Sequence, residues 1–128
     1  MVVLDSNIII YAVKPGEVVA RDFLIEQDYC VSAISLIEVL GYQNISPEDD
    51  RDIRRILRGG EIIWLSENIV NESIRLRRLK RMSLPDAAIA ATALCCGCEL
   101  ATRNVADFKN IDELRLINPF DVGETDKA

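Results

Sequence analysis

At 128 residues, the chain has the length of one domain with a buried core. Apolar residues make up 49% of it and charged residues 28%, a balance that excludes an intrinsically disordered protein. The net charge of −6 argues against a typical nucleic-acid binder, and the apolar runs are too short and too interrupted to span a membrane.

The apolar residues fall in short runs typical of buried strands, and amphipathic segments typical of helices separate them. In chain order, the expected elements are a strand over 2–4, helices over 7–13 and 17–27, a strand over 29–31, a helix from Ser32 to about Gly41, a helix within 46–60, a strand over 62–65, a helix from Ser66 to about Met82, a helix from Ser83 to Gly97, and strands over 98–102 and 114–118. This alternation predicts an α/β fold with a mostly parallel central sheet of four to five short strands flanked by helices. We expect one domain over 1–121 and a flexible tail over 122–128.

The chain has no histidine and four cysteines, and both facts narrow its chemistry. Without histidine there is no Ser-His-Asp or Cys-His nucleophile, so catalysis would depend on carboxylates, lysines, hydroxyls or a metal ion. The start, MVVLDSN, has an acid and no basic segment, unlike a secretory signal peptide, so we expect a cytoplasmic protein with reduced cysteines. Three of them lie in CCGC, which lacks the two-residue spacing typical of zinc ligands. We therefore expect small buried thiols at Cys30, Cys95, Cys96 and Cys98.

An acid ends the first expected strand, within VVLDSNIII. Burying an unpaired carboxylate is costly, so Asp5 is expected to have a partner or a function. One interpretation is that Asp5 caps the following helix, which would not exclude metal binding. In parallel α/β sheets, ligands bind outside the carboxyl ends of the strands. Asp5 stands at such an end, and Thr102, Arg103, Asn104 and Asp107 follow the carboxyl end of the fourth strand.

Two further acids stand out from the 21 in the chain. Glu38 lies among apolar residues in ISLIEVLGY, although it could belong to a solvent-facing stripe with Ser35 and Tyr42. Asp86 begins an alanine-rich helix in MSLPDAAIAATAL, where it could also be a surface acid that the helix dipole favours. Asp107, in TRNVADF, would be unremarkable on its own.

Four carboxylates at one edge of a sheet would repel one another unless a cation lay among them. Oxygen ligands favour a hard divalent ion such as Mg²⁺ or Mn²⁺ over zinc. The residues therefore predict a metal site that involves Asp5, Glu38, Asp86 and Asp107.

Four segments, VVLDSNIIIYAV, ISLIEVLGY, RMSLPDAAIAATAL and LATRNVADF, resemble in order the motif blocks of PIN-domain nucleases. More narrowly, they resemble the VapC-type toxins of toxin–antitoxin pairs, and the resemblance spans nearly the whole chain. It implies a PIN-like fold and an endoribonuclease that depends on Mg²⁺ or Mn²⁺. In that enzyme Asp5, Glu38, Asp86 and Asp107 would be catalytic. Asp5, Asp86 and Asp107 would hold the metal, directly or through water.

The resemblance also implies supporting residues and partners. It places Asn7, Thr102 and Asn104 as polar groups around the metal, although in some relatives the last acid falls at the position of Asn104. Glu38 would hold a second ion or orient the attacking water, and cleavage would leave a 5′-phosphate and a 3′-hydroxyl. The expected partners are RNA, a cognate antitoxin and a second copy of the chain, in a homodimer, with no membrane.

A basic stretch, RLRRLKR over 75–81, would let an acidic protein hold RNA. Arg78 and Arg81 lie three apart, which on a helix would put them on one face. Together with Arg103, they are expected to bind RNA phosphates. The alternative is a solvated helix face.

Other α/β families fit the motifs less well. A receiver domain needs its acceptor aspartate on the third strand, with a paired acid and a later lysine. A haloacid-dehalogenase-type phosphatase needs a second aspartate where Asn7 stands, and a dinucleotide enzyme needs a glycine-rich first turn. Two alternatives stay open: a PIN-like module that binds RNA or protein without cutting, and a housekeeping PIN nuclease. All four acids are present, which favours an active enzyme, because a carboxylate cage is costly without its metal.

Overall fold

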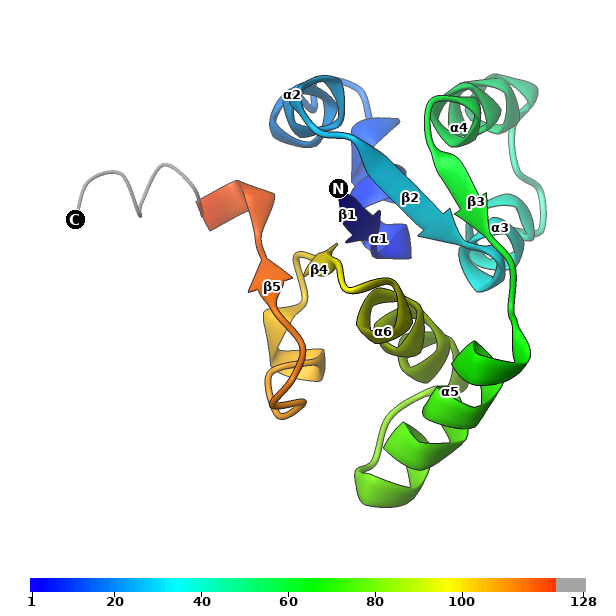
Figure 1. The fold of residues 1–128 in the computed structure, drawn as a ribbon. Coiled ribbons are helices and arrows are strands. Elements are labelled where there is room, and N and C mark those ends of the chain that lie inside the picture. Colours follow the sequence, from blue (N-terminus) through cyan, green and yellow to red (C-terminus); the bar gives the residue numbers. More distant parts are fainter. Residues whose placement is uncertain (122–128) are drawn as a thin grey trace.

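In a computed structural model of the protein, which describes residues 1–121, five short strands form one parallel sheet (Figure 1). The strands are β1 (Val2–Leu4), β2 (Tyr29–Ser32), β3 (Glu61–Ile63), β4 (Glu99–Ala101) and β5 (Leu116–Ile117). Their order is β3-β2-β1-β4-β5, so the chain begins at the centre of the sheet and builds one half before the other. All the pairings are parallel, which confirms the predicted α/β fold.

Six α-helices of the described residues surround this sheet (Figure 1). They are α1 (Ser6–Ala12), α2 (Val19–Glu26), α3 (Ala33–Leu40), α4 (Pro47–Arg58), α5 (Glu67–Leu79) and α6 (Leu84–Cys96). Two short 3₁₀ helices follow β4 and β5, namely η1 (Val105–Asp107) and η2 (Pro119–Asp121). The helix starts are well defined in the sequence, because a serine hydroxyl accepts a hydrogen bond from the first turn of α3, α4, α5 and α6.

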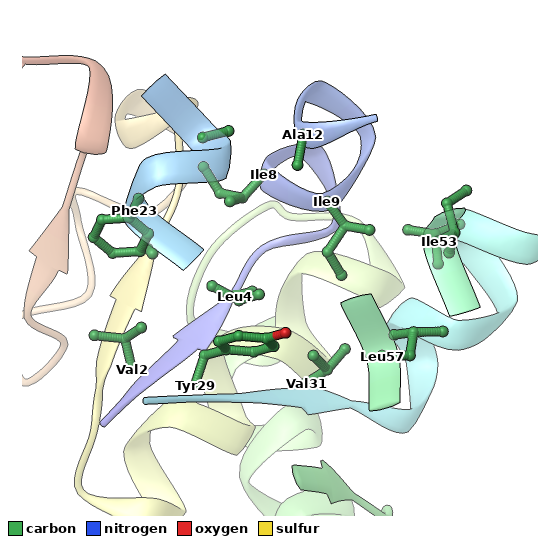
Figure 2. Close-up of a cluster of buried hydrophobic side chains, with 13 residues drawn as sticks. Val2, Leu4, Ile8, Ile9, Ala12, Phe23, Tyr29, Val31, Ile53 and Leu57 are labelled. Atoms are coloured by element: carbon green, nitrogen blue, oxygen red, sulfur yellow. The ribbon is translucent and has the colours of Figure 1, made fainter. Parts of the chain in front are cut away.

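Two hydrophobic clusters bury the sheet on both faces. Side chains alternate along a strand, so Val2 and Leu4 pack on one face and Val3 on the other. Figure 2 shows the first cluster, in which Phe23 of α2 and Leu57 of α4 lie over β1 and β2. The second cluster joins the opposite face to α5 and α6. Burial on both faces explains why the strands are apolar at almost every position.

The third strand is shorter than the predicted 62–65. It pairs with β2, which ends at Ser32 opposite Ile63, so the next residue has no neighbouring strand to pair with. Trp64 and Leu65 therefore leave the sheet, with 69% and 42% of their surfaces exposed.

The helix that was expected to reach Met82 ends at Leu79. Lys80 is extended, and its N–H closes the last helical turn. Ser83 already caps α6, so the residues between must reverse the chain direction and cannot remain helical. The amphipathic pattern continues past the end of the helix, and for this reason the length predicted from the sequence is too great.

The cysteines fit the expectation of buried thiols only in part. Cys30, on β2, is 1% exposed, and burial raises the pKa of its thiol to about 12. Cys95 and Cys96 are exposed because they occupy the last turn of α6, at the end of the helix, and Cys98 is half-buried.

Two other expectations concern the C-terminal tail and the absence of membrane-spanning segments. The tail predicted over 122–128 lies outside the described residues. Within residues 1–121, no helix is both long enough and apolar enough to cross a membrane.

Candidate active site

The acids of interest lie where β1 and β4 end side by side. The chain continues from β1 to β2 on one side of the sheet and from β4 to β5 on the other, so this is a topological switch point. Ligands bind at such points in parallel α/β sheets. The Asp5 N–H donates to the Ala101 carbonyl at 2.8 Å, which continues the parallel pairing and brings Asp5 beside Thr102.

Asp5 is buried, and a neighbouring hydroxyl holds it. Its surface is 6% exposed, and the fully buried Thr102 donates a hydrogen bond to Asp5 Oδ2 at 2.7 Å. The N–H of Asn104 in turn donates to Thr102 Oγ1 at 2.9 Å, which fixes the hydroxyl. Asp5 occupies the N-cap position of α1, but its side chain makes no capping hydrogen bond. The interpretation of Asp5 as an N-cap is therefore confirmed for its position but not for its carboxylate.

The environment of Asp5 disfavours its charge. Burial raises the pKa of Asp5 from 3.8 to about 6, and the negative charges of Asp86 and Glu38 add to the rise. The hydrogen bonds from Thr102 and from the Ser6 backbone act in the opposite direction. None of the ion pairs within residues 1–121 involves Asp5, so no cationic side chain offsets the cost.

Two serines position Glu38. The Ser6 hydroxyl of α1 donates to Glu38 Oε1 at 2.6 Å, and Ser6 Oγ lies 2.9 Å from Ser35 Oγ. Ser35 is fully buried and Glu38 is half-buried, whereas Tyr42 is 49% exposed. The polar stripe of α3 therefore faces α1 along most of its length rather than solvent. Sequence reasoning missed Ser6 as a site residue, although it interrupts the apolar run directly after Asp5.

Asp86 enters the site through the start of α6. Ser83 caps this helix, and its hydroxyl accepts a hydrogen bond from the Asp86 N–H at 3.1 Å. Burial raises the pKa of the Asp86 carboxyl, and the charges of Asp107 and Glu38 raise it further, whereas a hydrogen bond from Ser83 lowers it. Ala87 and its neighbours in α6 are almost completely buried, because small side chains let the helix pack closely. Asp107, at the end of η1, is exposed.

The structure therefore brings the four predicted acids into one electrostatic neighbourhood. The charges of Asp86 and Glu38 raise the pKa of Asp5. The charges of Glu38 and Asp107 raise the pKa of Asp86. An all-oxygen set of mutually repelling carboxylates suits a hard divalent cation, which would relieve the repulsion. In residues 1–121, however, no three acidic or cysteine side chains are arranged to hold one ion. Shared binding of an ion requires the side chains to rotate or water to bridge them.

The two predicted asparagines both make hydrogen bonds with the segment that follows β4. Asn7 Oδ1 accepts a long hydrogen bond of 3.5 Å from the Arg103 N–H, so it contacts the backbone after β4 rather than Asp5. Asn104 is exposed, and it supports Thr102 through its backbone N–H rather than through its side chain.

The three predicted RNA-binding arginines come from different segments, and only Arg78 lies within a helix. Arg81 follows the end of α5, so the prediction that it shares a helical face with Arg78 is wrong. Arg78 lines a shallow groove on α5. Arg103 lies directly after Thr102, with its guanidinium 4.6 Å from the ring centre of Tyr11 and 4.4 Å from that of Phe120.

Comparison with known families supplies the context for this geometry. Residues 2–114 match the family model described as the PIN domain. The chain belongs to the PIN domain family. This PIN domain is 29% identical over 124 residues to Ribonuclease VapC10 of Mycobacterium tuberculosis, a match that covers 90% of this chain and 91% of that protein.

Solved structures of toxin–antitoxin systems share the fold. A toxin–antitoxin complex from Klebsiella pneumoniae contains a chain that is 31% identical to this PIN domain, with a TM-score of 0.77 and coverage of 93% of this chain and 98% of that one. DNA-bound VapBC from Salmonella typhimurium has a chain with a TM-score of 0.79 and coverage of 93% and 99%, but at 20% identity it bears on the fold alone. These matches confirm the predicted PIN-like fold and the resemblance to VapC toxins.

Proposed function

We propose that this PIN domain is a metal-dependent endoribonuclease and the toxin of a toxin–antitoxin pair. The observation that carries the proposal is the group of four carboxylates at the switch point, which come from separate elements. The charges of Asp86 and Glu38 raise the pKa of Asp5, and those of Asp107 and Glu38 raise the pKa of Asp86. PIN domains are typically nucleases, and the relative from Mycobacterium tuberculosis is named a ribonuclease. The absence of histidine agrees with a reaction that needs no protein nucleophile.

Each acid has a role that its contacts support. Asp5, Asp86 and Asp107 would hold Mg²⁺ or Mn²⁺, an ion that polarises a phosphate oxygen and lowers the pKa of water. The hydroxyl of Thr102 keeps Asp5 oriented toward the site. Glu38, held by Ser6, would orient the water for in-line attack or contact a second ion, and cleavage would leave a 5′-phosphate and a 3′-hydroxyl.

The test is cleavage of a structured RNA pool by the purified protein. We expect cutting in Mg²⁺ or Mn²⁺ and none in EDTA. Asp5→Asn and Asp86→Asn should be inactive but folded, because loss of a charge relieves repulsion in the crowded site. Asp112→Asn changes an exposed acid in the loop before β5 and is the matched control. Equal cleavage with and without EDTA would overturn the metal mechanism.

The proposed partners follow from the neighbours and from the surface. The Klebsiella pneumoniae structure contains a toxin and an antitoxin, which supports a cognate antitoxin for this chain. A small reading frame directly upstream, encoding a DNA-binding N-terminal region, is expected in the genome, and its absence would favour a housekeeping nuclease. A homodimer is supported by an apolar groove at Leu65, Val70, Ile74 and Leu84, all of which are unusually exposed for their type.

A further inference from the structure

Two cations rest against one aromatic ring of α1, the helix that follows Asp5. The guanidinium carbon of Arg103 and the ammonium nitrogen of Lys14 each lie 4.6 Å from the ring centre of Tyr11. Phe120 meets Tyr11 edge to face, with ring centres 5.5 Å apart, and Arg103 lies 4.4 Å from the centre of the Phe120 ring. The guanidinium therefore occupies the corner between two rings. We call these four residues the cation–aromatic cluster.

The cluster is assembled from distant parts of the chain and held at several points. Tyr11 belongs to α1, Lys14 follows α1, Arg103 follows β4 and Phe120 lies in η2. Arg21 of α2 fixes the end of α1, because its side chain donates to the Ala12 carbonyl at 2.6 Å and to the Lys14 carbonyl at 3.1 Å. The aromatic rings also restrict the Arg103 rotamer through cation–π contacts.

The two cations have no anionic partner in the part of the chain that the structure describes. The ion pairs of residues 1–121 use Arg54, Arg55 and Arg75. Neither the guanidinium of Arg103 nor the ammonium of Lys14 makes a hydrogen bond there. Both residues are exposed. In a chain of net charge −6, two cations that rest against the same ring and have no anionic partner among residues 1–121 form a site for an anion.

Geometry favours a phosphate over a base as the bound group. The rings of Tyr11 and Phe120 already cover the guanidinium of Arg103, so its N–H edges are the available surface, and these match phosphate oxygens. Lys14 adds a compact point charge and cannot stack on a base. Arg103 directly follows Thr102, the hydroxyl that binds Asp5, so a phosphate held there would be close to the acids.

We infer that Lys14 and Arg103, supported by Tyr11 and Phe120, form a phosphate subsite that holds single-stranded RNA next to the point of cleavage. The inference rests on the proposed ribonuclease function and adds a position for the RNA backbone outside the carboxylates. It also differs from the basic stretch over 75–81, because α5 carries most of those cations. The subsite accounts for RNA binding by a chain whose overall charge is negative.

The test measures affinity for a short, labelled, single-stranded oligouridylate across a salt series, by fluorescence anisotropy. The full-length protein carries Asp5→Asn so that RNA is not cut, and Lys14→Gln and Arg103→Gln are added singly and together. Each lost phosphate contact should reduce the slope of log affinity against log salt by about 0.7, and both by about 1.4. The double variant should bind about tenfold more weakly at low salt.

Two further variants separate charge from structure. Arg115→Gln is the matched control, because Arg115 precedes β5, at the end of that strand opposite to Phe120, and within residues 1–121 its side chain donates only to the Gly97 carbonyl. Its salt slope should equal that of the background. Arg103→Lys keeps the charge, so it should keep the slope while losing affinity, because the planar fork is absent. Thermal unfolding of each variant checks that the fold is intact.

Three outcomes would overturn the subsite. An unchanged slope in the folded Lys14→Gln/Arg103→Gln variant, while the wild type still cuts RNA, would mean that the cations only cover the rings. An unchanged slope together with weaker binding of the antitoxin would assign the cluster to a protein partner. If the Asp5→Asn background binds no RNA and the wild type cuts none, the proposed function fails as well, which distinguishes the two failures.

Discussion

At the scale of single residues, Asp5 shows how a buried carboxylate lowers stability. Burial raises its pKa to about 6 in the folded state, against 3.8 for an ordinary aspartate. The folded protein therefore binds the proton of Asp5 more tightly than the unfolded chain does. As pH rises from about 4 to about 6, the folded state loses stability through this group. The loss is on the order of 3 kcal/mol, and Asp86 acts in the same direction.

This cost predicts that Asp5→Asn stabilises the protein when no divalent ion is present. The asparagine oxygen can still accept the Thr102 hydrogen bond, but the buried charge is gone. Urea unfolding in EDTA should give a higher free energy of unfolding for the variant above about pH 6, by up to about 3 kcal/mol. Below about pH 4 the difference should vanish, because Asp5 is then protonated. A variant that is less stable than the wild type at neutral pH would refute this explanation.

At the scale of elements, local signals predicted the helix starts better than the ends. Serine caps at Ser46, Ser66 and Ser83 mark where helices begin, because the cap bonds to the turn that follows it. The end of α5 lacks such a mark, since no glycine follows Leu79. The end of β3 depends on where β2 ends, which is a property of the sheet and not of the local sequence.

In the candidate site, residues that interrupt a local pattern were predictable from the sequence, whereas contacts between distant segments were not. Asp5, Glu38 and Asp86 stood out because each interrupts an apolar or small-residue pattern. The hydrogen bond of Ser6 to Glu38 depends on the packing of α1 against α3, which no local pattern reports. The contact between Arg103 and Tyr11 likewise joins segments that are far apart in sequence.

The N-cap of α6 gives a prediction at this scale. Ser83→Ala and Ser46→Ala each remove a serine that caps a helix from an exposed position, so each should destabilise the protein by about 1 kcal/mol. Only Ser83→Ala should also reduce RNA cleavage, because Ser83 orients the helix turn that carries Asp86. Thermal unfolding and cleavage rates measure both effects. Equal loss of activity in the two variants would mean that the cap affects cleavage only through stability.

At the scale of the whole molecule, the charge and the apolar surface are unevenly distributed. The acidic site is at the switch point, the cation–aromatic cluster gathers around Tyr11 of α1, and the apolar groove lies between α5 and the start of α6. Such separation would give the proposed RNA, second copy and antitoxin different surfaces of one small domain. Large apolar side chains that stay exposed outside the core support the proposed assembly.

The apolar groove predicts a homodimer that a single charge can break. Ile74 is 45% exposed and lines the groove, so Ile74→Glu should give a monomer by light scattering, because burying the new carboxylate would be costly. Ile25→Glu on α2 introduces the same charge at a site that is 82% exposed, outside the groove, and should stay dimeric. A wild type that is monomeric at every workable concentration would contradict the dimer.

Whether the carboxylates at the switch point hold a divalent ion is tested most directly by Mn²⁺ titration with calorimetry in EDTA-free buffer. The wild type should bind Mn²⁺, and near pH 6 the binding should release protons, because burial raises the pKa of Asp5 to about 6 and also raises that of Asp86, and the ion requires the charged forms. Asp86→Asn should lose the binding, and Asp112→Asn should retain it. Equal Mn²⁺ binding by the wild type and Asp86→Asn, with no proton release, would contradict the proposed metal site.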